Sequence, residues 1–209
     1  MSKKLRIAVL AVQGAFIEHE RMLAGLGAEV YELRNAADLR ERPDGLVLPG
    51  GESTVQSKLL RETGMLEPIK KWLADGLPVL GTCAGLILLA KNVVEDAPAA
   101  DATAAASARE FAPCFGVLPV TVRRNAYGRQ LGSFITEAEI AGIGSMRLNF
   151  IRAPYIESVA PGVEVLATVD DHIVAVRYEH QLALAFHPEV GDDPRLHEKF
   201  LALCAAQTH

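Results

Sequence analysis

A cysteine stands between two glycines at a point where the sequence predicts a strand turning directly into a helix. The stretch LPVLGTCAGLILLA runs from Leu77 to Ala90, with Cys83 near its centre. An apolar, strand-like run precedes the turn, and the run AGLILLAKNV that follows it is expected to be a helix. Glycines allow a sharp turn and the close approach of another group. A strand–turn–helix unit of this kind favours an α/β fold with parallel strands.

Strand and helix patterns alternate through the first half of the chain, and strand patterns dominate the second half. Strands are expected at 5–12, 28–33, 44–51 and 77–81, with helices at 14–27, 54–64, 65–76 and 84–93. Ser53 is expected to cap the second of these helices. Six strand-like segments follow, at 116–124, 128–135, 149–156, 163–169, 172–180 and 181–187, before a final helix at 193–207.

These patterns predict one domain over residues 1–209. Its fold class is α/β: a flavodoxin-like, three-layer α/β/α sandwich with a mostly parallel central sheet and a β-rich C-terminal half. Residues 95–110 form an alanine-rich stretch that carries no motif. We expect this stretch to be a surface loop or an added helix, because alanine is the best helix former.

Composition excludes several classes of protein. The 209 residues are 50% hydrophobic and 22% charged, which is typical of a globular domain. The net charge of −5 argues against a nucleic-acid partner. Neither a signal peptide nor a run long enough to span a membrane is recognisable. The three cysteines are far apart and lack metal-ligand spacing, so we expect no metal site, and a reducing cytoplasm fits them.

The turn at Cys83 is the thiol form of a nucleophile elbow, G-x-C-x-G. The helix that begins near Ala84 would point its N-terminal N–H groups at the sulfur, and this positive end favours the thiolate. The N–H of Ala84 would be placed to donate to an oxyanion. A small core cysteine beside a flexible turn explains the same pattern about equally well.

A second candidate follows the last predicted strand, in LALAFHPEV. His187 and Glu189 are two residues apart, so extended backbone would direct both side chains to the same side. The carboxylate could then orient the imidazole, and Cys83, His187 and Glu189 would act as nucleophile, base and orienting group. Without the other motifs, His187 and Glu189 could belong to a surface turn or act as a pair of metal ligands. Both candidates end strands, where open α/β sheets gather their sites.

The third candidate is the glycine pair in LVLPGGEST. The backbone amides of Gly50 and Gly51 would reach the same sheet edge and could supply a second oxyanion donor. Glu52 and Ser53 would stand beside them to hold a polar substrate. A glycine turn capped by Ser53 or Thr54 is the more ordinary explanation, and the P-loop pattern is absent.

The stretches PGGEST, GTCAGLILLA and FHPE together resemble the triad-type (class I) glutamine amidotransferases. The stretches LAVQGAFIEH, RRNAYGRQLGSF and NFIRAPYI resemble, more specifically, the family of glutaminase subunits of pyridoxal 5′-phosphate synthase. This resemblance runs from Ile7 to the last helix. The segment at 95–110 is longer than the usual connection in that family, which bears on partner contacts rather than on the chemistry.

The resemblance implies that Cys83 attacks the side-chain amide of L-glutamine and that His187, oriented by Glu189, serves as base and then as acid. It implies a glutamine site made of the loop residues Gly51, Glu52 and Ser53 together with Arg124, Ile151 and Arg152. The oxyanion donors would be Gly51 and Ala84. An arginine's planar fork suits the substrate's carboxylate, although a surface arginine is the plainer explanation.

The resemblance also implies partners. A (β/α)₈ synthase subunit would receive the ammonia within a large hetero-oligomer, and no cofactor is expected in this chain. Gln13, in the QG pair after the first strand, is a candidate relay to that partner. The alternatives are the glutaminase subunit of imidazole glycerol phosphate synthase, a ThiJ/PfpI-type cysteine protein, and a catalytically inactive regulatory subunit. The NAYGRQ and IRAP stretches argue against the imidazole glycerol phosphate synthase subunit. His187 and Glu189 argue against the ThiJ/PfpI-type protein, and the intact triad argues against an inactive regulatory subunit.

Overall fold

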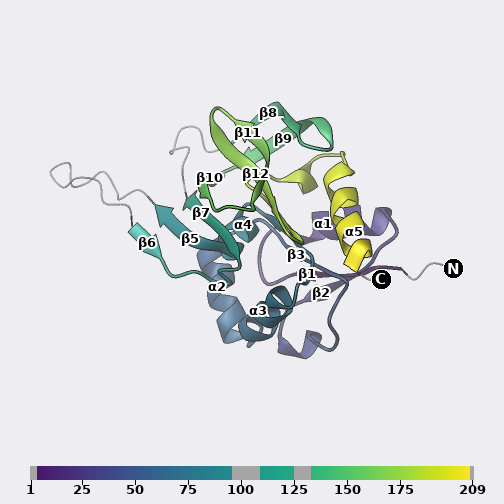
Figure 1. Ribbon diagram of the computed structural model, residues 1–209. Coiled ribbons are helices and arrows are strands. Elements are labelled where there is room, and N and C mark those ends of the chain that lie inside the picture. Colours follow the sequence, from purple (N-terminus) through teal and green to yellow (C-terminus); the bar gives the residue numbers. More distant parts are fainter. Residues whose placement is uncertain (1–3, 96–108, 125–132, 208–209) are drawn as a thin grey trace.

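A mixed β-sheet runs through the centre of the molecule, with helices on both faces (Figure 1). The computed structural model describes residues 4–95, 109–124 and 133–207. The α/β/α sandwich predicted from the sequence is confirmed. Most of the alanine-rich stretch at 95–110 and the NAYGRQ stretch lie outside the described residues.

One half of the sheet is parallel and is buried through most of its length. Its strands lie in the order β2-β1-β3-β4-β13, and each neighbouring pair is parallel. The four strands inside the edge strand β2 are almost wholly buried on both faces, which explains their largely apolar sequences, whereas β2 itself is mostly half-buried. The bounds are β1 Arg6–Leu10, β2 Glu29–Leu33, β3 Gly45–Leu48, β4 Val79–Thr82 and β13 Gln181–Leu184.

The other half of the sheet is largely antiparallel and continues the order as β12-β10-β7-β5-β6, with β11 paired to β12. A separate hairpin, β8-β9, lies outside this sheet (Figure 1). The bounds are β5 Ala90–Glu95, β6 Arg109–Phe111, β7 Leu118–Arg124, β8 Ser133–Ile140, β9 Gly144–Ile151, β10 Tyr155–Val159, β11 Glu164–Val169 and β12 His172–Tyr178.

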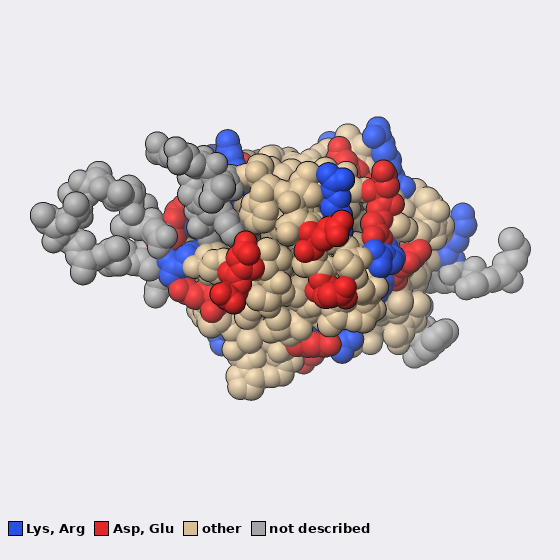
Figure 2. All heavy atoms as spheres, turned by 90° about the horizontal axis from the view of Figure 1, so that it is seen from above, with Lys and Arg blue, Asp and Glu red and all other residues tan. Residues whose placement is uncertain are grey.

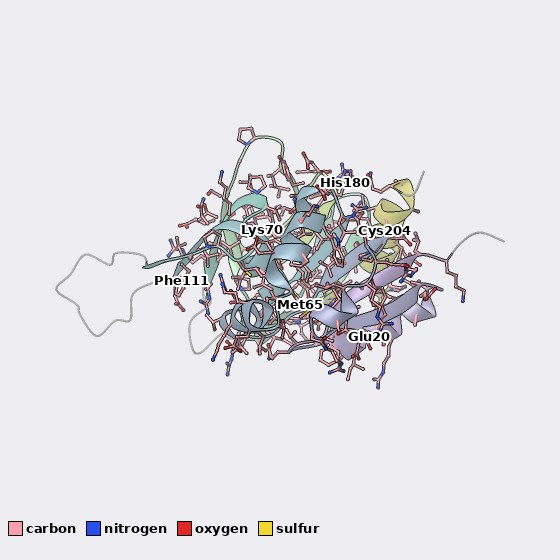
Figure 3. All side chains as sticks on the ribbon, turned by 90° about the horizontal axis from the view of Figure 1, so that it is seen from below. Glu20, Met65, Lys70, Phe111, His180 and Cys204 are labelled. Atoms are coloured by element: carbon pink, nitrogen blue, oxygen red, sulfur yellow. The ribbon has the colours of Figure 1, made fainter. Side chains whose placement is uncertain are left out.

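Helices α1 and α5 contact each other through buried histidines, and α2, α3 and α4 pack together elsewhere on the sheet. Cys204 on α5 (Figure 3) lies so close to Gly45 of β3 that a Cβ on this glycine would be 2.4 Å from its sulfur. The bounds are α1 Phe16–Gly25, α2 Ser53–Glu62, α3 Leu66–Ala74, α4 Ala84–Leu89 and α5 Arg195–Gln207, with short 3₁₀ helices η1 Ala36–Asp38 and η2 Pro188–Val190.

Three local expectations were wrong. The helix expected over 84–93 ends at Leu89, because Ala90 leaves the helical region and β5 pairs with β6 and β7. The strand expected over 149–156 is broken between β9 and β10, where Arg152 has a φ of 46°. Ser53 is not the cap of α2: Glu52 occupies that position, and its side chain makes no capping hydrogen bond.

Acidic and basic side chains are interspersed on the face shown in Figure 2, which carries β8, β9 and β11. In the described part of the chain, the helices are all too short or too polar to cross a bilayer.

Replacement of Gly85 by alanine should destabilise the fold by about 2 kcal/mol or more, because this kind of overpacking has no flexible neighbour to relieve it. A Cβ at Gly85 would be 2.0 Å from the carbonyl oxygen of Leu48, a backbone atom. Urea unfolding of the purified chain measures the effect. Gly25→Ala is the control, since a Cβ there meets nothing within 4 Å and alanine favours helix by up to about 1 kcal/mol. Equal free energies of unfolding for Gly85→Ala and Gly25→Ala would contradict the close packing of Gly85 against the Leu48 backbone.

Candidate active site

The turn between β4 and α4 holds Cys83 in a backbone conformation that few residues other than glycine adopt. Its φ is 48° and its ψ is −98°, a conformation of the kind that costs about 1–3 kcal/mol. The Cys83 N–H donates to the carbonyl of Leu184 at 2.8 Å, which ties the turn to β13. The Cys83 side chain is 7% exposed, and its sulfur lies 3.8 Å from the carbonyl oxygen of Ile151. The turn therefore has the strained backbone geometry expected of a nucleophile elbow.

His187 and Glu189 lie just beyond β13, at the beginning of η2. His187 Nδ1 is 2.7 Å from Glu189 Oε1, and both side chains are buried. Burial alone would lower the pKa of His187, but hydrogen bonds with Cys83 and Glu189 raise it to about 10. Burial alone would raise the pKa of Glu189, but the imidazoles of His19 and His187 hold it below its ordinary value. The three side chains therefore form a charged, hydrogen-bonded chain ending at the sulfur.

A pocket of about 480 Å³ opens over this sulfur. Ala84 and Glu189 lie behind it: Ala84 is buried at the start of α4, and Glu189 contacts His187 from the far side. Nearly every site residue expected from the sequence lines this pocket. These residues are Gln13, Gly50, Gly51, Glu52, Ser53, Cys83, Arg124, Ile151, Arg152 and His187.

The glycine loop after β3 is fixed against the segment after β1. The Ala15 N–H donates to the Gly50 carbonyl at 3.1 Å, and the Glu52 N–H donates to Gln13 Oε1 at 2.8 Å. A Cβ on Gly50 would lie 2.3 Å from His187 Cε1, and one on Gly51 would lie 2.4 Å from Gln13 Oε1. The close approach of the His187 and Gln13 side chains therefore explains both glycines.

Two arginines reach the pocket from different elements. Arg124, at the end of β7, lies over the ring of Phe111, with 4.8 Å between its guanidinium carbon and the ring centroid. Arg152 follows β9, and its Nη1 is 3.8 Å from Glu52 Oε1. Its side chain is 80% exposed, so it is available to a ligand at the pocket mouth. The pocket is thus lined by two cations and one carboxylate.

Three buried polar residues for which the sequence predicted no role lie near His187 and Glu189: His19 on α1, Thr82 on β4 and His197 on α5. His19 Nε2 is 3.2 Å from Thr82 Oγ1 and 3.3 Å from Glu189 Oε2. Gln56 was also overlooked; its side-chain amide donates to the Gln13 carbonyl at 2.9 Å. The available signal for His19 was a polar residue on the apolar face of a helix, four residues before Leu23.

Within the ranges the structure describes, we find no cluster of three or more side chains of the types that bind metals. His187 contacts Glu189 on one side and Cys83 on the other.

The sequence profile of the SNO glutamine amidotransferase family matches residues 9–206. Two relatives are named pyridoxal 5′-phosphate synthase subunit PdxT. The relative from Desulfitobacterium hafniense (strain Y51) is 56% identical over 197 residues, covering 94% of this chain and 92% of its own length. The relative from Methanocorpusculum labreanum is 51% identical over 201 residues, covering 96% of this chain and 98% of its own length. A solved structure, described as a glutamine amidotransferase, matches with a TM-score of 0.82 at 42% identity over 95% of this chain and 98% of that one.

We expect the free energy of unfolding to fall as the pH drops below about 6.5. Burial lowers the pKa of His19, and it lowers the pKa of His197 to about 3. Below pH 6.5 the unfolded chain therefore binds more protons than the folded chain. For His197 alone the loss between pH 6.5 and pH 5 is about 2 kcal/mol. His187 acts oppositely: its raised pKa stabilises the fold below 6.5, and this stabilisation is lost as the pH rises through about 10.

Urea titrations at several pH values measure this dependence, and His197→Gln should flatten the acid limb because glutamine does not titrate. A variant curve parallel to the wild-type curve between pH 5 and pH 7 would refute the role of His197, which faces His19 and Glu189.

Proposed function

Because the chain belongs to the SNO glutamine amidotransferase family, we propose that Cys83, His187 and Glu189 are its catalytic triad. The chain is a glutaminase: it hydrolyses glutamine and supplies ammonia for pyridoxal 5′-phosphate synthesis together with a synthase subunit. The observation that carries the triad is the buried hydrogen bond of 2.7 Å between His187 and Glu189, next to a cysteine in a strained elbow. The relatives at 51–56% identity carry the name of the pyridoxal 5′-phosphate synthase subunit, which favours this function over the imidazole glycerol phosphate synthase and ThiJ/PfpI alternatives.

The proposed reaction begins with attack of the Cys83 sulfur, whose proton His187 has taken as base, on the side-chain amide carbon of L-glutamine. The negative charge develops on the amide oxygen, and the N–H groups of Ala84 and Gly51 stabilise it. His187, whose raised pKa keeps its ring protonated at neutral pH, gives a proton to the departing nitrogen, and ammonia leaves. The product of this step is a γ-glutamyl thioester on Cys83.

Water then completes the hydrolysis. His187, now neutral, takes a proton from the attacking water, and a second tetrahedral intermediate forms in the same oxyanion hole. Its collapse releases L-glutamate and returns the sulfur and the protonated imidazole to their starting states. Glu189 keeps Nδ1 of His187 protonated through both steps, so the other ring nitrogen faces the reacting atoms.

The pocket supports a site for the amino-acid end of glutamine. We propose that Arg124 and Arg152 bind the α-carboxylate, since a guanidinium matches a carboxylate with two parallel hydrogen bonds. Glu52 carries the complementary charge for the α-amino group, and Gly51, Ser53 and Ile151 complete the lining.

We further propose that residues 1–209 form a single glutaminase domain in a cytoplasmic assembly. The synthase subunit would be a (β/α)₈ barrel, and the assembly a large hetero-oligomer. The family membership supports this organisation, and co-purification with the synthase subunit followed by light scattering tests it.

Cys83→Ala should abolish glutamate formation, with a loss of about 10⁴-fold or more, because a nucleophile acts as part of a unit. Cys114→Ala and Cys204→Ala are the matched controls and should retain activity. Burial raises the pKa of both of these thiols, that of Cys204 to about 12, so neither is a nucleophile at neutral pH. Trapping of a glutamine-derived adduct by mass spectrometry locates the thioester. Normal turnover by Cys83→Ala would end the triad proposal.

The isolated chain should be a poor glutaminase, and the synthase subunit should activate it. The Gly50–Glu52 loop carries one oxyanion donor and is held by Gln13 and Ala15, so a partner that moves this segment changes the donor. Loss of one oxyanion donor costs about 10²–10³ in rate. Glutamate formation is measured with saturating synthase subunit and without it, and equal rates would exclude this form of control.

Gly51→Pro sharpens the same experiment. Gly51 has a φ of 156°, whereas proline requires about −65° and has no N–H. The variant should lose the activated rate and still bind the synthase subunit, as measured by gel filtration. Retention of the activated rate would show that Gly51 is not an oxyanion donor.

A further inference from the structure

Two fully buried histidines lie behind the triad, on helices that are far apart in the sequence. His19 belongs to α1 and His197 to α5, and both are 0% exposed. Burial of a polar ring is costly unless the ring is hydrogen-bonded. Hydrophobic packing alone would be better served by leucine or phenylalanine, so the imidazole nitrogens need an explanation.

The nitrogens form a continuous polar chain that reaches the triad. His197 Nε2 is 2.9 Å from His19 Nδ1, and the two rings are tilted by 51°. His19 Nε2 lies 3.3 Å from Glu189 Oε2, and the other oxygen of Glu189 bonds to His187. The chain therefore runs from His197 through His19 and Glu189 to His187 and Cys83.

The chemistry of the neighbours fixes where the protons lie. An ionised carboxylate only accepts hydrogen bonds, so His19 Nε2 must carry a proton to be a favourable neighbour of Glu189. Burial keeps His19 neutral by lowering its pKa, so its Nδ1 is bare. A bare Nδ1 accepts, and His197 must then donate from Nε2. Thr82 Oγ1 at 3.2 Å gives the same Nε2–H of His19 a second acceptor.

Glu189 Oε2 has no aligned hydrogen bond of its own among the described residues. Its polar neighbour is the N–H of His19, at 3.3 Å. A buried carboxylate with one satisfied oxygen can rotate or take up a proton, and either change would release His187 from its orientation. The N–H dipole of His19 opposes both changes.

We propose that His19 is a positioning residue, whose neutral Nε2–H holds Glu189 in register with His187, and that His197 fixes the tautomer of His19. This inference rests on the proposed triad. His19 is not among the residues that line the substrate pocket, so its effect is on turnover rather than on glutamine binding.

The test uses glutaminase assays of the complex with the synthase subunit. His19→Leu should lower kcat by about 10–100-fold, the usual effect of removing an outer-shell partner, and leave KM within about 2-fold. His19→Gln, whose terminal amide can occupy the position of Nε2, should restore most of kcat. His19→Asn, whose amide reaches only the position of Nδ1, should not. A merely structural role would reduce kcat in the glutamine and asparagine variants alike.

Nitrogen-15 histidine NMR of the wild-type chain tests the proposal without a substitution. At neutral pH the His19 resonances, assigned by their loss in His19→Gln, should report a neutral ring protonated at Nε2. A ring protonated at Nδ1 or at both nitrogens would overturn the proposal, as would wild-type kcat in His19→Leu. If Cys83→Ala is inactive while His19→Leu has wild-type kcat, the triad stands and this inference alone fails.

Discussion

The hydrogen-bonded ladder joining β3, β4 and β13 is the constraint on which the rest of the site depends. These three strands are parallel neighbours, so their carboxyl ends meet at one edge of the sheet. Each strand is followed directly by one part of the machinery: the glycine loop after β3, Cys83 after β4 and His187 after β13. A shift of register between any two of these strands would separate groups that must act within hydrogen-bonding distance.

The site is costly to build, and the surrounding core makes it possible. Cys83 is held at a positive φ, and Glu189, His187, His19 and His197 are buried together. An isolated buried charge would be prohibitive, but here Glu189 bonds to His187 and His19 bonds to His197, so most of these polar groups face a complementary one. The β4–α4 turn is in turn fixed by the contact between Gly85 and the Leu48 backbone, which allows α4 to approach β3 closely.

Helix α1 contacts the machinery at two points. The segment before α1, Gln13–Ala15, is hydrogen-bonded to the Gly50–Glu52 loop. His19, within α1, contacts Glu189. The Gly50–Glu52 loop and the Glu189 carboxylate are therefore supported by α1 and the segment directly before it. A ligand or partner that displaces α1 would change both together, because the two contacts are less than two helical turns apart.

The sequence by itself determined the α/β class and the sharp turn at Cys83, because these depend on hydrophobic periodicity and glycine spacing. It also predicted that His187 and Glu189 meet, but it did so from extended backbone, whereas Pro188–Val190 form the 3₁₀ helix η2 and the two side chains still lie 2.7 Å apart. It did not determine the end of α4 at Leu89, where strand pairing with β6 and β7 overrides a helical pattern. Nor did it determine the contact between His19 and His197, which are 178 residues apart in the chain. Only the tertiary structure decides which buried polar groups meet, because hydrogen-bond partners on different elements leave no periodic trace in the sequence.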